Sequence, residues 1–426
     1  MNKRTKTALR RWCLYGWTFA KWTMAASAIG VVCGLIGTMF HFGVHEVTAF
    51  RGTHPWVLYL LPLAGFVIVS FYKLTETDGL GTDDIIDAVH EGKRLPILLL
   101  PAIFFGTVLT HLCGGSAGRE GAALQMGGTI GQCMGRTFRL DDRDLRVATL
   151  AGMAAFFSAL FGTPLAATVF AIMVISIGVI YHVALYPSLL AALVAYGVSV
   201  RLGVEPTRFT VAVPDQSVGM FVRVAALGVL CALVSILFCK LMHGAGHLMK
   251  RIKKPWLRVI CGGFAVIALT WIFGTDYNGA GMDVVTRAIE QETVAVPWAF
   301  LLKLVFTAVT LAAGFKGGEV VPSFFVGATF GCAVSPLLGL PVGFGAAVGL
   351  AAVFCGVTNC PVASTLLAVE LFGAEGMLYF ALACCLSYML SGYQGLYSSQ
   401  TILYSKLKAQ FINVHTNAYH AGEKTE

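Results

Sequence analysis

The chain has 426 residues, of which 57% are hydrophobic and 12% are charged, and its formal net charge is +8. A soluble domain carries about 25% charged residues, so this composition excludes a soluble protein and indicates a chain embedded in a membrane. The basic residues lie between apolar segments rather than in a polar module, which argues against a nucleic-acid-binding protein.

The chain begins with a basic lead-in, residues 1–21, which contains a run of lysines and arginines from Lys3 to Arg11. A second basic cluster lies at Lys250–Lys254. Under the positive-inside rule, both clusters are expected to face the cytoplasm. The first apolar stretch has no clear small-residue cleavage site, so we interpret it as a retained helix rather than a secretory signal. These features predict a multi-pass protein of the cell (inner) membrane.

Apolar segments then follow one another almost without polar interruption. They cover residues 24–48, 55–72, 97–113, 147–203, 220–246, 257–274, 297–315 and 322–392. Several are divided by glycine, proline or single polar residues into pieces shorter than the roughly 20 residues that a straight span needs. Broken helices are tolerated in a membrane only where the freed backbone is buried or lines a polar cavity. We therefore predict an all-α membrane protein with broken and tilted helices, as in transporters and channels.

An internal repeat divides the chain into two halves. Four blocks recur in the same order at an offset of roughly 200 residues: Gly79–Asp83 as Gly279–Asp283, His41/His45 as His243/His247, Gly118/Glu120 as Gly317/Glu319, and Gly152–Ala171 as Gly349–Ala368. We predict a first membrane repeat over residues 22–203, a second over 204–392, and a C-terminal segment over 393–426. Basic ends on both halves indicate opposed orientations, with the substrate near the midplane of the bilayer.

The segment Gly114–Gly131 reads GGSAGREGAALQMGGTIG and places Arg119 and Glu120 between glycines inside an apolar region. Charges in such a setting are costly and usually mark a transport pathway. A glycine-rich turn that leads into a helix presents free N–H groups and a positive dipole end, which bind anions. The second block, GFKGGEVVP, repeats this pattern with Lys316 and Glu319. The alternative interpretation is two local ion pairs that settle helix ends.

These motifs resemble those of the CLC family of anion channels and anion/proton exchangers. Gly118–Gly121 is similar to the GREG motif of that family, and the second block resembles GFKGGEVTP of its fluoride-exporting branch, with Val321 in place of threonine. Gly79–Gly81 is similar to the first anion-site loop, with an apolar residue in place of the serine of chloride members. Gly395–Ser398 resembles the segment that carries the central tyrosine.

The resemblance implies a CLC-type fold with two inverted-topology repeats, and a homodimer with one anion pathway in each subunit. Glu120 would be the gating glutamate, which occupies the anion path when charged and carries a proton when neutral. Glu319 would handle fluoride and its proton. The residues implied in anion binding are Gly79, Leu80, Gly81, Gly118, Arg119, Gly121, Gly318, Val320, Val321 and Tyr397. Tyr404 is the less favoured candidate for the central tyrosine, and either tyrosine could instead be an interfacial anchor.

Two positions bear on the choice of ion. An apolar residue stands at the position of Glu319 in the family's chloride members, and a protonated carboxyl is a well-matched donor for fluoride. Many CLC exchangers place an inner proton-relaying glutamate near Met173 or Val174, but both of these residues are apolar. The repeat-related acid is Glu370, which we interpret as structural. The leading hypothesis is therefore a fluoride/proton antiporter, with a chloride or other anion exchanger or channel as the alternative.

Other functions are less well supported by the sequence. An intramembrane enzyme would need an activated nucleophile, and Ser116 near His111 is the only serine candidate, without a legible dyad. His41, His45 and Glu46 have helical spacing that suits zinc, as do His243 and His247, but neither half offers an evident third ligand. The expected partners are fluoride, protons and the lipid bilayer, with chloride as the alternative anion. We expect no metal site, no cofactor and no enzymatic activity.

Overall fold

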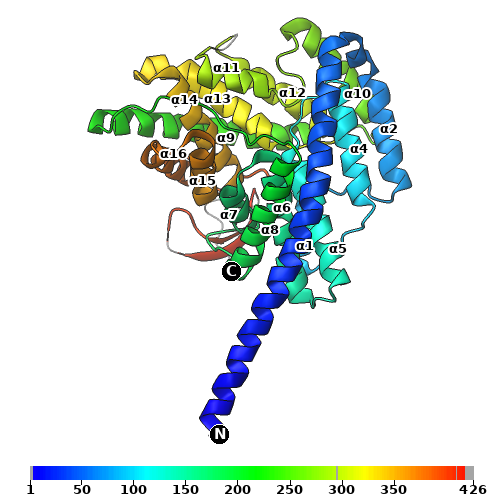
Figure 1. Ribbon diagram of the computed structural model, residues 1–426. Helices are drawn as coiled ribbons and strands as arrows, with labels where there is room; N and C mark the ends of the chain where they lie inside the picture. Colours follow the sequence, from blue (N-terminus) through cyan, green and yellow to red (C-terminus); the bar gives the residue numbers. More distant parts are fainter. Residues whose placement is uncertain (1–2, 294–295, 409, 418–426) are drawn as a thin grey trace.

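The computed structural model describes residues 3–293, 296–408 and 410–417, and helices make up most of this part of the chain (Figure 1). The elements of the first half are α1 (Lys3–Thr53), η1 (Pro55–Leu60), α2 (Leu61–Leu74), α3 (Thr82–Glu91), α4 (Leu99–Leu112), α5 (Glu120–Thr137), α6 (Asp142–Phe161), α7 (Pro164–Met173), β1 (Ser176–Ile177), η2 (His182–Ala184) and α8 (Leu185–Arg201). A segment without regular structure then leads to the second half.

The second half repeats this order of helices and ends in a hairpin. Its elements are α9 (Val218–Met249), α10 (Pro255–Phe273), α11 (Met282–Glu290), α12 (Ala299–Ala313), α13 (Val320–Leu338), α14 (Val342–Thr358), α15 (Pro361–Phe372), α16 (Met377–Leu390), β2 (Thr401–Tyr404) and β3 (Phe411–His415). The fold is therefore all-α apart from one small sheet.

The helices have the lengths expected of a multi-pass membrane protein. Seven helical stretches in the described part of the chain are long and apolar enough to cross a membrane. Six further apolar helices have only 10–17 residues, among them α7 and α15, each of which starts at a proline. The prediction of broken helices is confirmed.

The two halves build the same helix pair from small residues. In the first half, a methyl group on Gly127 would collide with the carbonyl of Gly152, and in the second half one on Gly327 would collide with the carbonyl of Gly349. Without side chains at these points, the backbones of α5 and α6, and of α13 and α14, lie in direct contact. Such close packing holds the starts of α5 and α13 at fixed positions.

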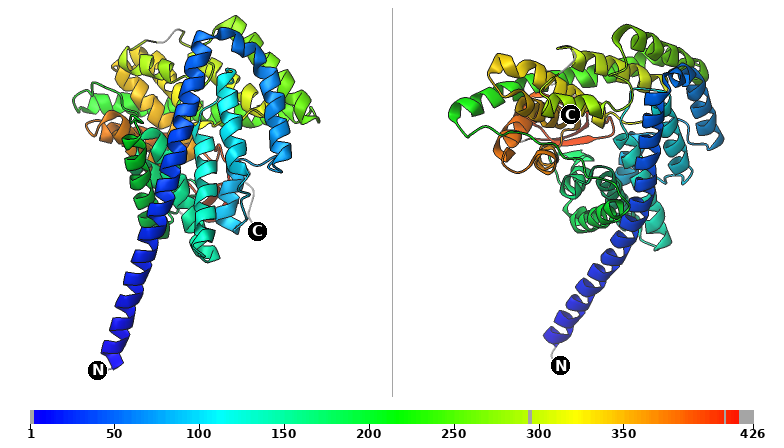
Figure 2. Two further views of the ribbon diagram at one scale, coloured as in Figure 1. Left: turned by 45° about the vertical axis from the view of Figure 1, so that its right-hand side comes forward. Right: turned by 45° about the horizontal axis from the view of Figure 1, so that its top comes forward.

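α1 runs without a break from Lys3 to Thr53, so the basic residues from Lys3 to Arg11 lie on the same helix as the first apolar segment. The N-terminal part of α1 extends away from the other helices in all views (Figures 1 and 2). Apolar side chains such as Trp12 and Trp17 are exposed there, and Lys21 forms an ion pair with Asp144 at the start of α6.

The three-stranded sheet joins the C-terminal segment to the first half. β1 pairs in parallel with β2, and β2 pairs antiparallel with β3. Gln400, immediately before β2, donates from its amide to the carbonyls of Val174 (2.9 Å) and Thr358 (3.0 Å), one in each half. This sheet fixes the position of the loop that contains Tyr397.

The packing of α10 against α2 bears on the side of the membrane at which Lys250–Lys254 lies. Trp271, near the end of α10, donates to the hydroxyl of Tyr59, just before α2 (3.2 Å). Val259, near the start of α10, packs against Gly65 within α2. The two helices are therefore antiparallel, and the start of α10 lies on the side of the molecule from which α1 begins. This arrangement agrees with a cytoplasmic position for both basic clusters.

We expect cysteines introduced at Lys6 and Lys253 to react with a membrane-impermeant thiol reagent only after cells are permeabilised. A cysteine at Thr53, at the opposite end of α1, should react in intact cells. The unmodified protein is the background control, because Cys13, Cys261 and Cys385 are exposed. Labelling of the Lys6 or Lys253 variant above this background in intact cells would contradict the topology.

Candidate functional site

The two glycine-rich helix starts meet at the centre of the molecule. The N–H of Gly118 donates to the carbonyl of Gly318 (2.7 Å), and the N–H of Gly318 donates to the carbonyl of Gly118 (2.8 Å). A twofold axis that passes between Gly118 and Gly318 would produce such a reciprocal pair of hydrogen bonds. The residues that precede α5 and α13 are therefore neighbours across the pseudo-twofold axis of the repeat.

This pairing corrects the sequence alignment of the repeat by one residue. Arg119 and Glu319 are the residues that cap the starts of α5 and α13, with similar backbone angles, so Glu120 is equivalent to Val320 rather than to Glu319. The glutamates at the two starts are thus not symmetric copies. Glu120 is the first residue of α5, whereas Glu319 is the residue before α13, so the two side chains have different surroundings.

Glu120 is fully buried and lies between the two helix starts. Its Oε2 accepts a hydrogen bond from the N–H of Val321 (3.2 Å), in the first turn of α13. Its Oε1 has no hydrogen-bond partner among the described residues and lies 4.0 Å from Nε of Arg119. A carboxylate at the N-terminus of a helix occupies the position that an anion would take.

Arg119 turns away from this carboxylate toward the opposite side of the molecule from the basic clusters. Its Nη1 donates to Nδ1 of His41 (3.0 Å), and its guanidinium lies over the ring of Phe161. It lines a cavity of about 700 Å³ together with Arg51 and His111. The cavity is rich in basic side chains and reaches Val321, so it can lead anions to the helix start that Glu120 occupies.

Glu319 and Tyr397 lie near Glu120. The hydroxyl of Tyr397 is buried without a hydrogen-bond partner among the described residues. It is close enough to Glu319, Asp83 and Glu120 to interact with their charges. No ion pair involves the carboxyl group of Glu319 in the described part of the chain. Lys316 lies instead 4.0 Å from the ring centre of Tyr72. The ion pair between Lys316 and Glu319 that the sequence left open is not formed.

The loop Gly79–Gly81 borders the same site, but two of its N–H groups are already used. Leu80 donates to the carbonyl of Thr77 (3.2 Å), and Gly81 donates to the carboxylate of Asp84 (2.8 Å). Asp83 accepts from the N–H of Ser399 (3.0 Å) and so ties this loop to the Tyr397 segment. Asp83 is a site residue that was not predicted from the sequence, although it is the last residue of a repeated block.

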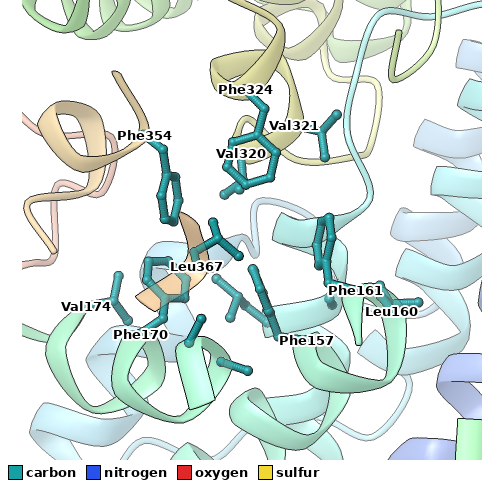
Figure 3. Close-up of a cluster of buried hydrophobic side chains, with 14 of the residues drawn as sticks. Phe157, Leu160, Phe161, Phe170, Val174, Val320, Val321, Phe324, Phe354 and Leu367 are labelled. Atoms are coloured by element: carbon teal, nitrogen blue, oxygen red, sulfur yellow. The ribbon is translucent and has the colours of Figure 1, made fainter. Parts of the chain in front are cut away.

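The start of α13 lies above a cluster of aromatic and aliphatic side chains from both halves (Figure 3). Phe161 contacts Phe324 (ring centres 6.1 Å apart), and Phe324 contacts Phe354 (5.1 Å). Val320 and Val321 border this cluster in the figure. An apolar surrounding excludes water and strengthens electrostatic interactions at the helix start.

Tyr404 lies outside this site, and Ser116 and His111 do not form a catalytic pair. Tyr404 is 47% exposed on β2, where its ring packs against Phe411. The hydroxyl of Ser116 shares a hydrogen bond with Thr307 (3.0 Å), and His111 donates to the carbonyl of Thr107 (2.9 Å). Ser116 and His111 are therefore not hydrogen-bonded to each other.

The two histidine pairs also have separate roles in packing. The rings of His41 and His45 are nearly parallel, with centres 6.4 Å apart, and His41 accepts from Arg119. His243 donates to the carbonyl of Cys239 (2.7 Å) and lies near Ser398. Among the described residues, no group of three or more His, Cys, Asp or Glu side chains could hold a metal ion.

Glu370 caps a helix of the other half. Its two carboxylate oxygens accept from the N–H groups of Leu165 (3.0 Å) and Ala166 (2.8 Å), in the first turn of α7. Met173 and Val174, where a proton-relaying glutamate was considered, pack as apolar residues. This geometry supports the interpretation of Glu370 as structural.

We expect Glu370→Ala to lower the free energy of unfolding by about 1–3 kcal/mol, because two N–H groups lose a charged acceptor. The ratio of protons to anions transported should stay unchanged. Thermal unfolding of the purified protein and a proton-coupled flux assay would measure the two quantities, with Glu375→Ala, at an exposed acid, as the matched control. A changed transport ratio at unchanged stability would contradict the structural role.

The close approach of the two helix starts requires glycine. A methyl group at Gly121 would lie 2.9 Å from Cα of Gly318, and one at Gly318 would collide with the nitrogen of Gly121. We expect Gly318→Ala to reduce transport and to destabilise the fold by about 1–3 kcal/mol, as overpacking does. Gly197→Ala in α8, where a methyl group meets nothing within 4 Å, is the control. Equal flux and unfolding temperature in both variants would exclude a tight junction.

Comparisons with known proteins agree with the fold. The family model described as "Voltage gated chloride channel" matches residues 63–392. A protein of Pseudomonas syringae pv. tomato described as "Chloride/fluoride channel protein" is 39% identical over 399 residues, which cover 91% of this chain and 88% of that protein.

Two solved structures are similar over most of their length. A CLC-type fluoride/proton antiporter superposes with a TM-score of 0.88 and 32% sequence identity, over 91% of this chain and 99% of the other. A slow cyanobacterial Cl⁻/H⁺ antiporter superposes with a TM-score of 0.76 at 19% identity, over 87% and 94% of the two chains, and supports the fold alone. The chain therefore belongs to the voltage gated chloride channel (CLC) family and is a multi-pass membrane protein with the CLC-type fold.

Proposed function

We propose that the protein is a fluoride/proton antiporter in which Glu120 is the gating glutamate. The observation that carries this proposal is the position of the Glu120 carboxylate. One of its oxygens accepts from the first turn of α13, while the other has no hydrogen-bond partner among the described residues. The same group can therefore take the place of an anion and accept a proton.

The chemistry of exchange follows from competition at this one position. A charged carboxylate is attracted to the N-terminus of α13 and blocks it against anions. Protonation removes that charge, so the side chain leaves the helix start more easily and an anion can replace it. The proton travels on Glu120, and the anion travels when Glu120 is displaced. Movement of the two ions is thereby coupled without a second proton-relaying acid near Met173.

Two further groups support fluoride as the transported anion. Glu319 has no competing ion pair, and a protonated carboxyl at this position would donate a strong hydrogen bond to a small, hard anion. The buried hydroxyl of Tyr397 is a second free donor near the same carboxylates. The antiporter that is 32% identical to this chain is described as a fluoride/proton antiporter, in agreement with this choice.

Chloride is the alternative anion, and one feature of the site favours it. Val321 replaces a threonine of the fluoride-exporting branch and removes a hydroxyl group from the helix start. The Pseudomonas relative is described with both ions in its name.

We also propose a homodimer in the cell (inner) membrane. The exposed apolar side chains Leu165 of α7 and Val362 of α15 lie at the starts of two helices that pack together, one from each half. They offer an apolar face for a second copy.

The test is ion efflux from proteoliposomes that contain the purified protein. We expect fluoride efflux to drive proton uptake, and chloride efflux to be slower by about ten-fold or more, because chloride gains less from strong hydrogen-bond donors. Protein-free vesicles with a proton ionophore give the background. Equal rates for the two anions would exclude fluoride selectivity, and fluoride flux without proton movement would exclude antiport.

A further inference from the structure

A second concentration of positive charge lies away from the transport site. A cavity of about 250 Å³ is formed by the C-terminal ends of α3 and α5 and the start of α6. Its lining includes Gly92, Arg94, Gln132, Arg136, Asp142 and Arg146. Three arginines thus face one acid around a small polar space. The mechanism proposed above uses none of these side chains.

The arginines are not neutralised within the described part of the chain, where no ion pair involves Arg94, Arg136 or Arg146. Nε of Arg146 is buried and has no hydrogen-bond partner among the described residues. A buried, charged donor without an acceptor is costly, so an anionic ligand would satisfy it. The C-terminal end of α3 also favours a cation. That explains why the guanidinium of Arg146 lies beside Gly92, at the end of α3. It does not explain why three arginines line the same cavity.

The cavity is preorganised by a buried amide. Gln132 is 4% exposed, accepts from the N–H of Leu95 (2.8 Å) and donates to the carbonyl of Lys93 (2.8 Å). Its side-chain oxygen also accepts from Nη2 of Arg136 (2.5 Å). Gln132 therefore holds Arg136 in place and fixes the segment that carries Arg94. A fixed guanidinium loses less conformational entropy when it binds an anion.

The position of the cavity suggests where its ligand comes from. It lies on the side from which α1 begins, because Asp144 of α6 pairs with Lys21 of α1. Exposed apolar residues lie close in sequence to two of the arginines: Phe138 (43% exposed) is two residues after Arg136, and Ile97 (61% exposed) is three residues after Arg94. Arginines beside exposed apolar residues are typical of the boundary between the hydrocarbon core and the headgroups.

We infer that this cavity binds the phosphate group of an anionic phospholipid in the leaflet on the side of the basic clusters. Arginine guanidinium groups bind phosphate oxygens in a bidentate geometry, and three of them around one acid leave a surplus of positive charge. The volume suits a phosphodiester with a small headgroup and is below the range of larger ligands, about 300–1,000 Å³. Because α3 starts at the Gly79–Gly81 loop and α5 at Glu120, the lipid would brace the far ends of two helices that form the transport site.

The test uses the full-length protein in a neutral detergent and measures its unfolding temperature during titration with short-chain phosphatidylglycerol. Short-chain phosphatidylcholine and inorganic phosphate are titrated in parallel. We expect phosphatidylglycerol alone to raise the unfolding temperature in a saturable manner. The double variant Arg136→Gln/Arg146→Gln should need about ten-fold more lipid or worse for half-saturation, because two charge-assisted contacts are lost. Arg143→Gln, at an exposed arginine that does not line the cavity, should behave as the wild type.

Three outcomes would overturn the inference. An equal effect of phosphatidylcholine would mean that the lipid chains alone stabilise the protein. An equal effect of inorganic phosphate would assign the cavity to a free anion. An unchanged half-saturation in the double variant would exclude the arginines. Should the double variant not fold, Arg136→Lys and Arg146→Lys keep the charge but lose the bidentate geometry, and each should weaken lipid binding.

Discussion

Glu120→Gln is expected to abolish proton-coupled transport, with a loss of proton flux of about 100-fold or more, as for removal of an essential acid–base group. Glutamine has nearly the same size as glutamate, and its amide oxygen can still accept from the N–H of Val321, so the junction of α5 and α13 should survive. It cannot exchange a charge for a proton. Coupling is therefore lost for a chemical rather than a structural reason.

The measurement is fluoride-driven proton uptake into proteoliposomes, with the unfolding temperature of the purified variant as the control for folding. Glu370→Gln is a useful comparison, because it also removes a charged carboxylate from a helix start but lies outside the transport site. Undiminished proton flux in Glu120→Gln would refute the assignment of the gating glutamate. Anion flux can either stop or become uncoupled, and both results agree with the proposal.

The second large effect is expected for Glu319→Ala, which should cost fluoride far more than chloride. The substitution removes a hydrogen-bond donor from the site and leaves a wider, less polar space. A hydrogen bond to a charged group contributes about 1.5–3 kcal/mol, which corresponds to a ten-fold or greater loss of fluoride flux. Chloride is larger and depends less on strong donors, so its flux should change little or increase.

Lys316→Gln separates this role from a structural one. In the structure, Lys316 lies over Tyr72 and forms no ion pair with Glu319, so its replacement should leave the ratio of fluoride to chloride flux unchanged. Equal losses of fluoride and chloride in Glu319→Ala would mean that the glutamate is structural. A change of selectivity in Lys316→Gln that matches that of Glu319→Ala would indicate that the two residues act as a pair.

The sequence was sufficient for the properties that depend on local composition. The small share of charged residues indicated a membrane protein, and the proline- and glycine-divided apolar segments predicted short helices such as α7 and α15. Glu120 was expected at a helix start, and α5 indeed begins at this residue. Glycines that interrupt an apolar segment beside an acid are a local pattern, so this helix start could be predicted without knowledge of distant residues; why Gly121 must be glycine, the close approach of Gly318, could not.

Only the tertiary structure decided which residues meet. The hydrogen bond between Glu120 and Val321 joins positions 201 residues apart, and the pseudo-twofold axis between Gly118 and Gly318 sets it. The axis also shows that Glu120 and Glu319 are not equivalent. The sequence could not reveal this, because a shift of one residue in a glycine-rich repeat leaves the match between the two halves almost unchanged.

The sequence likewise could not predict the hydrogen-bond and charge partners of the other charged groups. Lys316 and Glu319 are three residues apart, and an ion pair between them was the alternative interpretation, yet Lys316 lies over Tyr72. Glu370 caps α7 of the other half. Tyr397 is buried near the site, and Tyr404, in a similar local sequence, is exposed on a strand. Hydrogen-bond and charge partners depend on where the folded backbone places each side chain, and the sequence pattern specifies only which face or turn the residue occupies.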